Sequence, residues 1–300
     1  MTKSSEGDRT SLNSIGVVGL GYVGSSLAHA FSKKFIIESY DLNKASTTSS
    51  IKELCSKTKI IFVCVPTPMR KDGSCDTTIV ERVCKEIDEH ARNHIVVIKS
   101  TIVPGTSERI SKDLKNSSLL FNPEFLTEAN ALKDFENQDK IIIGTTNLDE
   151  PSSLICKRIY QKVFPLAKII LCSASEAEML KYFTNTFLAA KVSFANEMYQ
   201  ICKAQDLDYN NIVSLLKLDK RIGQSHLQVP GPMPASDNSG RYLYGFSGSC
   251  FVKDINALIN HAEQLGVDPK VLKAAWNKNL EVRPERDWEC LKGRAVTAED

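Results

Sequence analysis

The sequence lacks any apolar run that approaches the ~20 residues a membrane-spanning helix needs. Its polar first residues, Met1–Asn13, lack the apolar core of a signal peptide, and we expect them to form a disordered leader. The 38 Lys and Arg against 36 Asp and Glu leave a net charge of +2, too little to favour nucleic acid or an anionic membrane. These absences predict a cytoplasmic protein with neither of those partners.

Cysteine spacing excludes two further classes of site. None of the nine cysteines stands in a Cys-x-x-Cys pair, which argues against structural zinc and thioredoxin-type chemistry. An odd, scattered set is typical of reduced thiols in a reducing compartment. His90 and His94 are four residues apart, but they have no third ligand nearby, so we interpret them as a solvated helix end. The sequence therefore predicts no metal site.

Short apolar runs alternate with segments of helical spacing up to Ser173, which is typical of βαβ units and a mainly parallel sheet. The runs lack strict polar alternation, as expected for strands covered on both faces. We expect strands at Ile15–Val18, Phe35–Tyr40, Lys59–Val65, Ile95–Lys99, Lys140–Ile143 and Lys168–Leu171, and helices at Tyr22–Lys33, Thr77–His90, Thr106–Lys115 and Pro151–Val163.

After Ser173 the pattern is helical, beginning with one long helix over Ala174–Asp206. The prediction is an α/β fold, with a Rossmann-type parallel-sheet domain at 14–173 and an all-helical domain at 174–300. Shorter helices are expected at Tyr209–Leu218, Phe251–Leu265 and Pro269–Asn279, with a long loop rich in Gly, Pro and Ser over Asp219–Ser249.

The long helix carries one apolar stripe at three- and four-residue steps. Such a stripe is covered either by the same subunit or by a second copy. Its members are Leu180, Phe183, Phe187, Ala190, Phe194 and Met198.

The first chemical motif is Gly19-Leu20-Gly21-Tyr22-Val23-Gly24, which follows a predicted strand and opens a predicted helix. In this context the glycines permit a tight turn, approach of a pyrophosphate and close helix–strand packing, and the helix N-terminus attracts the phosphates. Asp41 ends the next strand, 20 residues after Gly21. A carboxylate there accepts hydrogen bonds from ribose hydroxyls and favours NAD over NADP, although an ordinary turn residue is the alternative.

The second motif places Cys250 between Gly245-Phe246-Ser247-Gly248-Ser249 and a predicted helix. A helix N-terminus lowers a thiol pKa through its dipole. Lys253 follows one turn later, and Asp254 shares the face of Cys250 at the i+4 position. A nucleophile, a cation and a base at this spacing indicate covalent catalysis. A buried, inert cysteine is the alternative, and it is our interpretation of the other eight.

Further motifs lie between the glycine turn and the Cys250 segment. They are Val65-Pro66-Thr67-Pro68, Ser100-Thr101-Ile102-Val103-Pro104-Gly105-Thr106, Asn122-Pro123-Glu124-Phe125-Leu126, and Lys181, Asn185 and Asn196-Glu197 on the long helix. Taken in order, all these motifs resemble the UDP-glucose/GDP-mannose dehydrogenase family. Arg221-Ile222-Gly223 and Val229-Pro230-Gly231-Pro232 favour its UDP-glucose branch.

The resemblance implies a reaction with NAD as the cofactor. Two successive hydride transfers would convert the primary alcohol of a nucleotide sugar to a carboxylate, UDP-glucose to UDP-glucuronate, through a thiohemiacetal and a thioester on Cys250. The alternatives are a dehydrogenase of GDP-mannose or a UDP-N-acetylhexosamine, a 3-hydroxyacid dehydrogenase with a single hydride transfer, and a non-catalytic protein that binds NAD or a nucleotide sugar.

The resemblance also implies roles for residues. Lys181 and Asn185 would contact substrate and stabilise an oxyanion, while Asp254 and Glu124 handle protons and Thr101 holds water. A solvated helix face is the alternative for the first pair, and a helix N-terminal acid for Glu124. The cofactor would be contacted by Gly19, Gly21, Tyr22, Val23, Gly24, Asp41, Pro66, Thr67, Ser100, Thr101, Glu128 and Lys253. The substrate would be contacted by Glu124, Phe125, Leu126, Lys181, Asn185, Arg241, Tyr244, Gly245, Phe246 and Cys250.

Three features depart from the family pattern or extend it. Ser247 stands where the family loop reads Gly-Phe-Gly-Gly, which would carry a cost if that position needed a positive φ. The loop Met233–Tyr244 is long, and Arg241 within it either pairs with a phosphate or is a solvated arginine. We expect the chain to be a short form without the third, UDP-binding domain that many family members carry. The family further implies a homodimer through the long helix.

Overall fold

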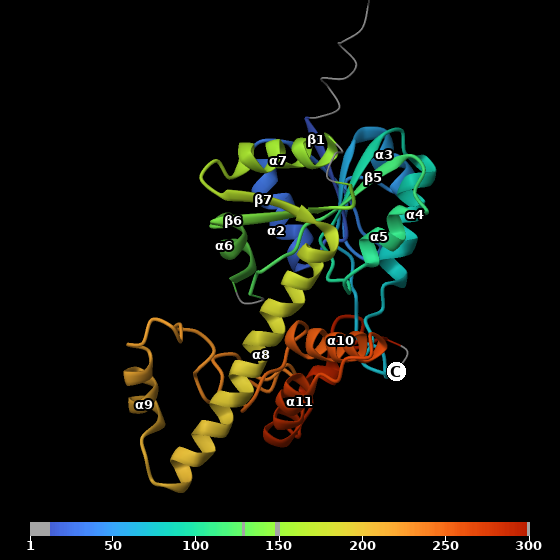
Figure 1. Ribbon diagram of the computed structural model, residues 1–300. Helices are drawn as coiled ribbons and strands as arrows, with labels where there is room; N and C mark the ends of the chain where they lie inside the picture. The colour runs from blue at the N-terminus through green and yellow to red at the C-terminus, as the bar shows by residue number, and fades with distance from the viewer. Residues whose placement is uncertain (1–12, 128–129, 148–150, 299–300) are drawn as a thin grey trace, which may run out of the picture. The chain divides into compact units, whose positions relative to one another are not determined.

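The computed structural model describes residues 13–127, 130–147 and 151–298 (Figure 1). The chain forms two compact units. The first comprises Met1–Thr67 and Thr77–Lys181, and the second comprises Pro68–Asp76 and Tyr182–Asp300. The expected leader lies outside the described residues up to residue 12. The domain boundaries at 14–173 and 174–300 stay a prediction.

Within the described residues, the first unit contains a seven-stranded sheet in the order β2-β1-β3-β4-β5-β6-β7. All neighbours are parallel apart from β5 and β6, so the predicted mainly parallel sheet is confirmed. The strands are β1 (Ser14–Val18), β2 (Ile36–Tyr40), β3 (Ile60–Val63), β4 (His94–Ile98), β5 (Ser117–Phe121), β6 (Lys140–Thr145) and β7 (Lys168–Ser173).

Helices cover both faces of this sheet (Figure 1). One face packs against α2 (Tyr22–Ser32), α6 (Ala131–Glu136) and α7 (Pro151–Val163). The other packs against α3 (Ile51–Lys57), α4 (Thr78–His90) and α5 (Thr106–Ser111). This double cover explains why β1, β3 and β4 are buried along their whole length and read as continuous apolar runs.

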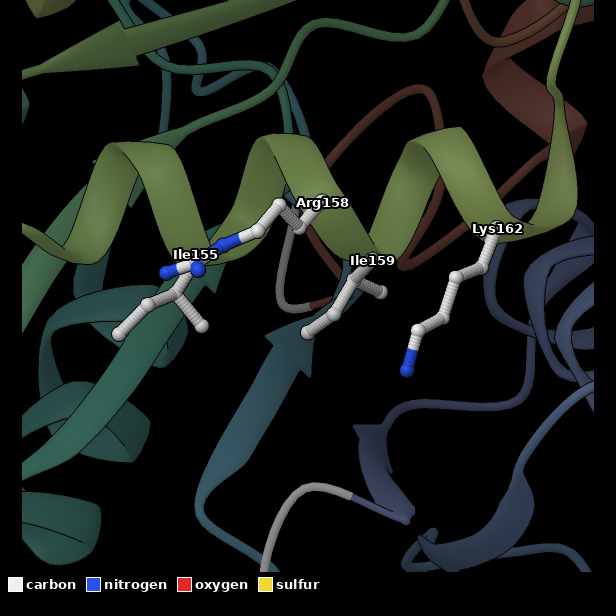
Figure 2. A pocket seen from close by; sticks show the side chains of 4 residues that line it. All are labelled: Ile155, Arg158, Ile159 and Lys162. Atoms are coloured by element: carbon white, nitrogen blue, oxygen red, sulfur yellow. The ribbon is translucent and has the colours of Figure 1, made fainter.

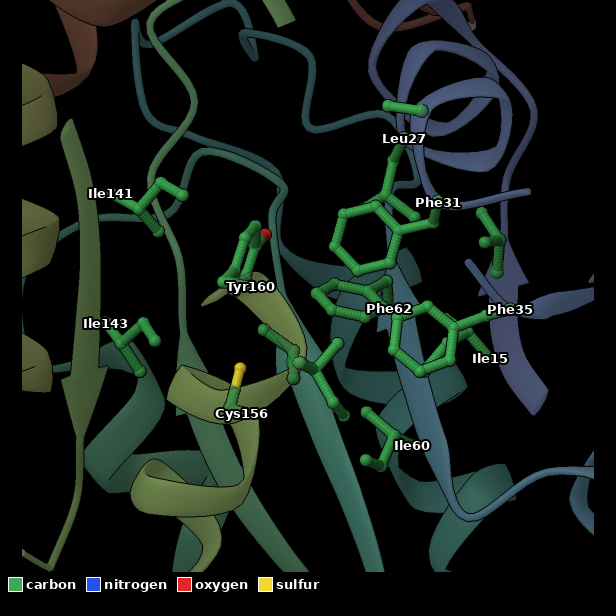
Figure 3. Close-up of a cluster of buried hydrophobic side chains, with 14 of the residues drawn as sticks. Ile15, Leu27, Phe31, Phe35, Ile60, Phe62, Ile141, Ile143, Cys156 and Tyr160 are labelled. Atoms are coloured by element: carbon green, nitrogen blue, oxygen red, sulfur yellow. The ribbon is translucent and has the colours of Figure 1, made fainter. Parts of the chain in front are cut away.

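Aromatic side chains fill the first of these two layers. Figure 3 shows Phe31 among Leu27, Phe62 and Tyr160. The ring of Phe31 meets that of Tyr160 edge-on at 5.3 Å between centroids and that of Phe62 at 5.5 Å. Edge-to-face pairs at this distance contribute about 0.5–1.5 kcal/mol each beyond burial of their area. This packing holds α2, and with it the glycine turn, against β1 and β3.

The strand order places the glycine turn and Pro66-Thr67 at one edge of the sheet. Because β2 and β3 lie on opposite sides of β1, the chain reverses direction across the sheet between β1 and β3. Ligands of such folds bind outside the carboxyl ends of the strands at this point. The glycine turn follows β1, and Pro66-Thr67 follows β3.

The long helix expected over Ala174–Asp206 is confirmed as α8 (Ala174–Ala204), which begins in the first unit and belongs to the second from Tyr182 on. The second unit is mainly helical. It contains α9 (Tyr209–Leu216), α10 (Phe251–Gln264), α11 (Lys270–Val282) and the short 3-10 helix η2 (Asp287–Cys290). The α/β fold with a helical region after the sheet is therefore confirmed. The hydrophobic core of the second unit contains Phe246, Val252, Ile255 and Trp288.

Between β3 and α4, residues Pro68–Asp76 belong to the second unit. Met69 donates its N–H to the carbonyl of Ala295 at 2.9 Å and accepts from the N–H of Thr297 at 3.0 Å. Its side chain packs on the core that contains Trp288 and Val296. The last described residues are thus tied by backbone pairing to a segment more than 200 positions earlier, which no local sequence pattern indicates.

Two local interpretations of the sequence were incomplete or wrong. The strand β5 and the helices α3 and α6 were not predicted. His94 is not at a solvated helix end, because it lies buried in β4, where its Nε2 is 3.0 Å from the carbonyl of Cys55 and its Nδ1 accepts from the N–H of Arg92. Among the described residues, no helix has both the length and the apolar character needed to cross a bilayer.

Candidate active site

The glycine turn has the shape that its sequence predicts. Gly19 adopts φ +88°, and a Cβ there would collide with the carbonyl of Cys64. A Cβ on Gly24 would overlap the carbonyl oxygen of Gly19, so helix and turn pack too closely for any side chain. A Cβ on Gly21, the N-cap of α2, would meet nothing within 4 Å. Two glycines are thus required by packing, while Gly21 borders open space at a helix N-terminus.

Asp41 is joined directly to this turn. Its Oδ2 accepts from the N–H of Leu20 at 2.6 Å, and its Oδ1 accepts from the N–H groups of Asn43 at 2.8 Å and Lys44 at 3.0 Å. Partial burial would raise the pKa of Asp41, but these three backbone donors and the Lys44 charge lower it below the usual value. An ionised carboxylate therefore lies beside the second residue of the glycine motif.

The ends of β3 and β4 are tied together by Ser100. Its hydroxyl donates to the carbonyl of Val65 at 2.7 Å, and Thr67 beside this connection is buried whereas Pro66 is exposed. Thr101 follows Ser100 and is half-buried. The Ser100 hydroxyl thus has a structural partner, and the predicted cofactor contacts of these four residues stay predictions.

Glu178, on α8, holds the start of α5. Its two carboxylate oxygens accept from the N–H groups of Gly105 at 2.7 Å and Ser107 at 2.9 Å, which caps the start of α5. Burial raises the pKa of Glu178 to about 7, although these hydrogen bonds oppose the rise. No local sequence pattern indicates this role of Glu178, because its partners lie 71 and 73 positions away in the chain.

Glu124 and Lys181 form a buried ion pair in the first unit. Lys181 Nζ lies 3.6 Å from Glu124 Oε2, and the two side chains are 3% and 9% exposed. The same ammonium lies 5.7 Å from the centre of the Phe125 ring, and Glu124 also accepts from the N–H of Leu126. The alternative of a solvated helix face is therefore wrong for Lys181. Glu128 lies outside the described residues.

A second buried cation, Lys99, interacts electrostatically with both members of this pair. Lys99, at the end of β4, donates to Asn122 Oδ1 at 2.6 Å, and Asn122 also accepts from Tyr160 and donates to the carbonyl of Ile142 at 2.6 Å. Burial lowers the pKa of Lys99 to about 8, with Lys181 lowering it and Glu124 opposing. Asn122 precedes Pro123-Glu124, so this network fixes the strand end from which Glu124 extends.

In the second unit, Cys250 is the N-cap residue of α10. One turn later, Lys253 Nζ is 2.7 Å from Asp254 Oδ1, and Asn185 Nδ2 donates to Asp254 Oδ2 at 2.6 Å. Asp254 is fully buried and Asn185 is 7% exposed, so the alternative of a solvated face is wrong for Asn185 too. Burial would lower the pKa of Lys253, but Asp254, Cys250 and Cys75 raise it above its usual value.

The remaining predicted substrate residues precede Cys250. Gly245 and Phe246 are held by buried asparagine side chains, whereas Tyr244 places its ring 5.5 Å from that of Tyr199. Arg241 is 56% exposed and its Nη2 is 3.0 Å from Asp237 Oδ2, an ion pair on the surface of the loop. The phosphate contact predicted for Arg241 stays a prediction.

One hollow of the first unit lies apart from these candidate residues. Figure 2 shows this hollow of about 270 Å³ beside α7, lined by Ile155, Arg158, Ile159 and Lys162. None of the described candidate residues lines it. No group of three or more His, Cys, Asp or Glu side chains arranged for a metal ion occurs within the described ranges.

Comparison with known proteins identifies the arrangement. Residues 35–164 match the sequence model of the NAD binding domain of the UDP-glucose/GDP-mannose dehydrogenase family, and residues 175–281 match that of its central domain. The chain belongs to this family. A UDP-glucose dehydrogenase from the archaeon Pyrobaculum islandicum is similar in structure, with a TM-score of 0.80 and 31% identity over 93% of this chain and 70% of that one.

Curated relatives of the family are similar over most of this chain. The protein YtcA of Bacillus subtilis is 35% identical over 299 residues, which cover 88% of this chain and 66% of YtcA. The GDP-mannose 6-dehydrogenase of Pseudomonas aeruginosa is 33% identical over 251 residues, covering 79% of this chain and 54% of that enzyme. The chain thus spans about half to two thirds of the length of these relatives.

Membership in the UDP-glucose/GDP-mannose dehydrogenase family agrees with the geometry of the glycine turn, and NAD is the cofactor. Three features of the glycine turn fit NAD. They are the open space at Gly21, the N-terminus of α2 and the ionised Asp41 beside Leu20. When bound, NAD supplies a hydride acceptor. The structure adds a neighbour that the motif did not indicate, because Lys44 Nζ donates to the carbonyl of Leu20.

Ser247, which departs from the family pattern, does not strain the backbone. Ser247 is not among the described non-glycine residues with positive φ, whereas Gly245 and Gly248 on either side of it have φ +67° and +77°. A Cβ on Gly245 would overlap Asn279 Oδ1. The conformations that favour glycine therefore occur at the neighbouring positions, and the cost considered for Ser247 does not arise.

Proposed function

We propose that this chain oxidises the primary alcohol of a nucleotide sugar to the carboxylate with two equivalents of NAD, and that UDP-glucose is its substrate. The observation that carries the proposal is Cys250 at the N-terminus of α10, followed one turn later by the buried Lys253–Asp254 pair that also binds Asn185. A single alcohol oxidation needs no thiol, whereas oxidation of an aldehyde does need a nucleophile that adds to it.

The first oxidation converts the alcohol to an aldehyde. The hydroxyl proton passes to a base, the hydride leaves the same carbon for the cofactor, and a carbonyl forms. Glu124 and Asp254 are the carboxylates proposed to handle protons, with Thr101 holding water. Glu124 sits beside the ammonium of Lys181 and Asp254 beside that of Lys253, so each proton change takes place next to a fixed positive charge.

The second oxidation proceeds through a covalent adduct. The Cys250 thiolate adds to the aldehyde carbon, and the carbonyl oxygen becomes an oxyanion that takes up a proton to give a thiohemiacetal. The thiohemiacetal then gives its hydride to a second equivalent of NAD and its hydroxyl proton to Glu124 or Asp254, which leaves a thioester. Water then breaks the carbon–sulfur bond, which releases the carboxylate and regenerates the thiol. Lys181 and Asn185 are proposed to stabilise the oxyanion, as donors fixed before the reaction do.

The proposal is tested by counting NADH. Purified protein is incubated with excess NAD and limiting UDP-glucose, GDP-mannose or a UDP-N-acetylhexosamine, and NADH and uronate are quantified. We expect two NADH and one uronate per UDP-glucose. One NADH per substrate would indicate a single-step dehydrogenase, activity with another sugar alone would reassign the substrate, and binding without turnover would favour a non-catalytic protein.

We further propose that two copies associate through α8. Among the stripe residues, Phe183, Phe187 and Phe194 are 64%, 63% and 59% exposed, while Tyr182 and Ala189 on the same helix are fully buried. Packing among the described residues therefore does not bury these three phenylalanines. Three large apolar side chains along one helix favour contact with a complementary surface, and a second copy supplies the same stripe.

Phe187→Glu is expected to weaken this dimer at least about a hundredfold, because a twofold interface loses two buried phenylalanines, each worth about 1.5–3 kcal/mol. Sedimentation equilibrium of wild type and variant measures the effect, with circular dichroism confirming the helix content. Leu166→Glu is the matched control, because Leu166 is 98% exposed and lies outside α8. Equal masses for wild type and Phe187→Glu would refute the proposed interface.

A further inference from the structure

Residues Tyr244–Ser249, here called the thiol loop, connect directly to Cys250 and are held by side chains from elsewhere in the second unit. The four residues Tyr244, Gly245, Phe246 and Ser247 each make a hydrogen bond to one of these. The bonds are Arg283 Nη1 to the Tyr244 carbonyl (2.9 Å), Gly245 N–H to Asn196 Oδ1 (3.1 Å), Phe246 N–H to Asn279 Oδ1 (2.7 Å), Asn279 Nδ2 to the Phe246 carbonyl (3.1 Å), and the Ser247 hydroxyl to Asp287 Oδ2 (3.0 Å).

Asp287 is the centre of this arrangement. Its Oδ1 accepts from Arg283 Nε at 2.6 Å, and its Oδ2 accepts from Arg283 Nη2 at 3.0 Å, from the Ser247 hydroxyl and from the N–H of Ser236 at 2.5 Å. The side chains of Arg283 and Asp287 are 4% and 1% exposed. One buried carboxylate therefore joins η2, the end of α11, the long loop at Ser236 and the thiol loop.

The charge state of this centre is settled by its partners. Burial would raise the pKa of Asp287, but Arg283, the Ser236 N–H and the Ser247 hydroxyl lower it to about 2. The carboxylate is therefore ionised across the range in which an enzyme works, and its bidentate pair with Arg283 is of the strong, geometrically specific kind. A fixed ionic acceptor holds a hydroxyl more firmly than solvent does.

We propose that Asp287 is a positioning residue, which holds the thiol loop through the Ser247 hydroxyl and through Arg283 so that Cys250 stays at the N-terminus of α10. The inference rests on the proposed function only in taking Cys250 as the nucleophile. A thiolate at that position is favoured by the N–H groups of the first turn and by Lys253. A loosened loop lets the sulfur leave this environment, so less thiolate forms at neutral pH.

Ser247→Ala tests the proposal, because it removes a single hydroxyl and leaves the buried Arg283–Asp287 pair intact. Alkylation of Cys250 by iodoacetamide is followed by peptide mass spectrometry as a function of pH, with Cys172 of the first unit as internal standard. We expect the midpoint to rise by about 0.7 pH unit, which makes alkylation at neutral pH about fivefold slower. With UDP-glucose, kcat should fall about fivefold while KM for NAD stays unchanged.

Two further variants separate positioning from general destabilisation. Ser247→Thr keeps the hydroxyl and should restore the alkylation profile, whereas Ser214→Ala, which removes an exposed hydroxyl from α9, should leave it unchanged. Fluorescence of Trp276 and Trp288, the two tryptophans of the sequence, monitors folding of the second unit. Asp287→Asn should show the larger shift if it folds.

The result that overturns the proposal is an unchanged alkylation profile in Ser247→Ala. That result is independent of the proposed function, because alkylation needs neither NAD nor a sugar. Wild-type protein that shows no uronate formation, together with a shifted alkylation profile in Ser247→Ala, would overturn the proposed function and leave the positioning role of Asp287 standing.

Discussion

Cys250→Ser is expected to reduce uronate formation by about 10³-fold or more, the scale on which removal of a nucleophile acts. A serine hydroxyl at the N-terminus of α10 remains protonated at neutral pH, since neither the helix dipole nor Lys253 compensates for its much higher pKa. Without a nucleophile the aldehyde has no second hydride to give. NADH production should therefore fall to one equivalent per sugar at most, measured with limiting substrate.

The control for this experiment is Cys290→Ser, because Cys290 is an exposed thiol of the same unit. We expect it to retain two NADH per sugar. Trapping supplies independent support, since rapid acid quenching of wild type during turnover should reveal a sugar adduct on the Cys250 peptide that Cys250→Ser lacks. Turnover of Cys250→Ser to uronate at the wild-type rate would refute the covalent mechanism.

Much of the fold could be predicted because its strongest signals are local. Strands β1, β3 and β4 are buried on both faces and appear as continuous apolar runs, and α8 keeps a helical period over 31 residues. In contrast, β5 begins with Ser117-Ser118, and α3 and α6 have seven and six residues. Such short or polar segments carry too little periodicity, so their structure depends on tertiary packing.

The candidate site could likewise be predicted only where its residues are close in the sequence. Lys181 with Asn185, and Cys250 with Asp254, could be grouped because residues four apart share a helix face. The pairing of Asp254 with Asn185, 69 positions away, and the capping of α5 by Glu178 depend on the fold and leave no local pattern. The Arg283–Asp287 pair has the i, i+4 spacing of a surface ion pair, and only its burial distinguishes it.

Lys181→Met is expected to lower kcat by about 10²–10³-fold, the usual effect of removing one donor to an oxyanion. The variant also leaves Glu124 in a buried place without its cation, which by itself costs about 3–5 kcal/mol of stability. A loss of activity in the single variant therefore has two explanations. Lys203→Met, at the exposed last turn of α8, controls for loss of a lysine and should keep full activity.

A double-mutant cycle with Glu124→Gln distinguishes the two explanations. The double variant has no uncompensated charge and should recover most of the stability that Lys181→Met loses, as measured by urea denaturation followed by circular dichroism. If Lys181 acts on the substrate, kcat of the double variant should lie about a hundredfold below that of Glu124→Gln alone. If the two values are equal, Lys181 serves only to neutralise Glu124, and the oxyanion must be stabilised by Asn185 and other donors.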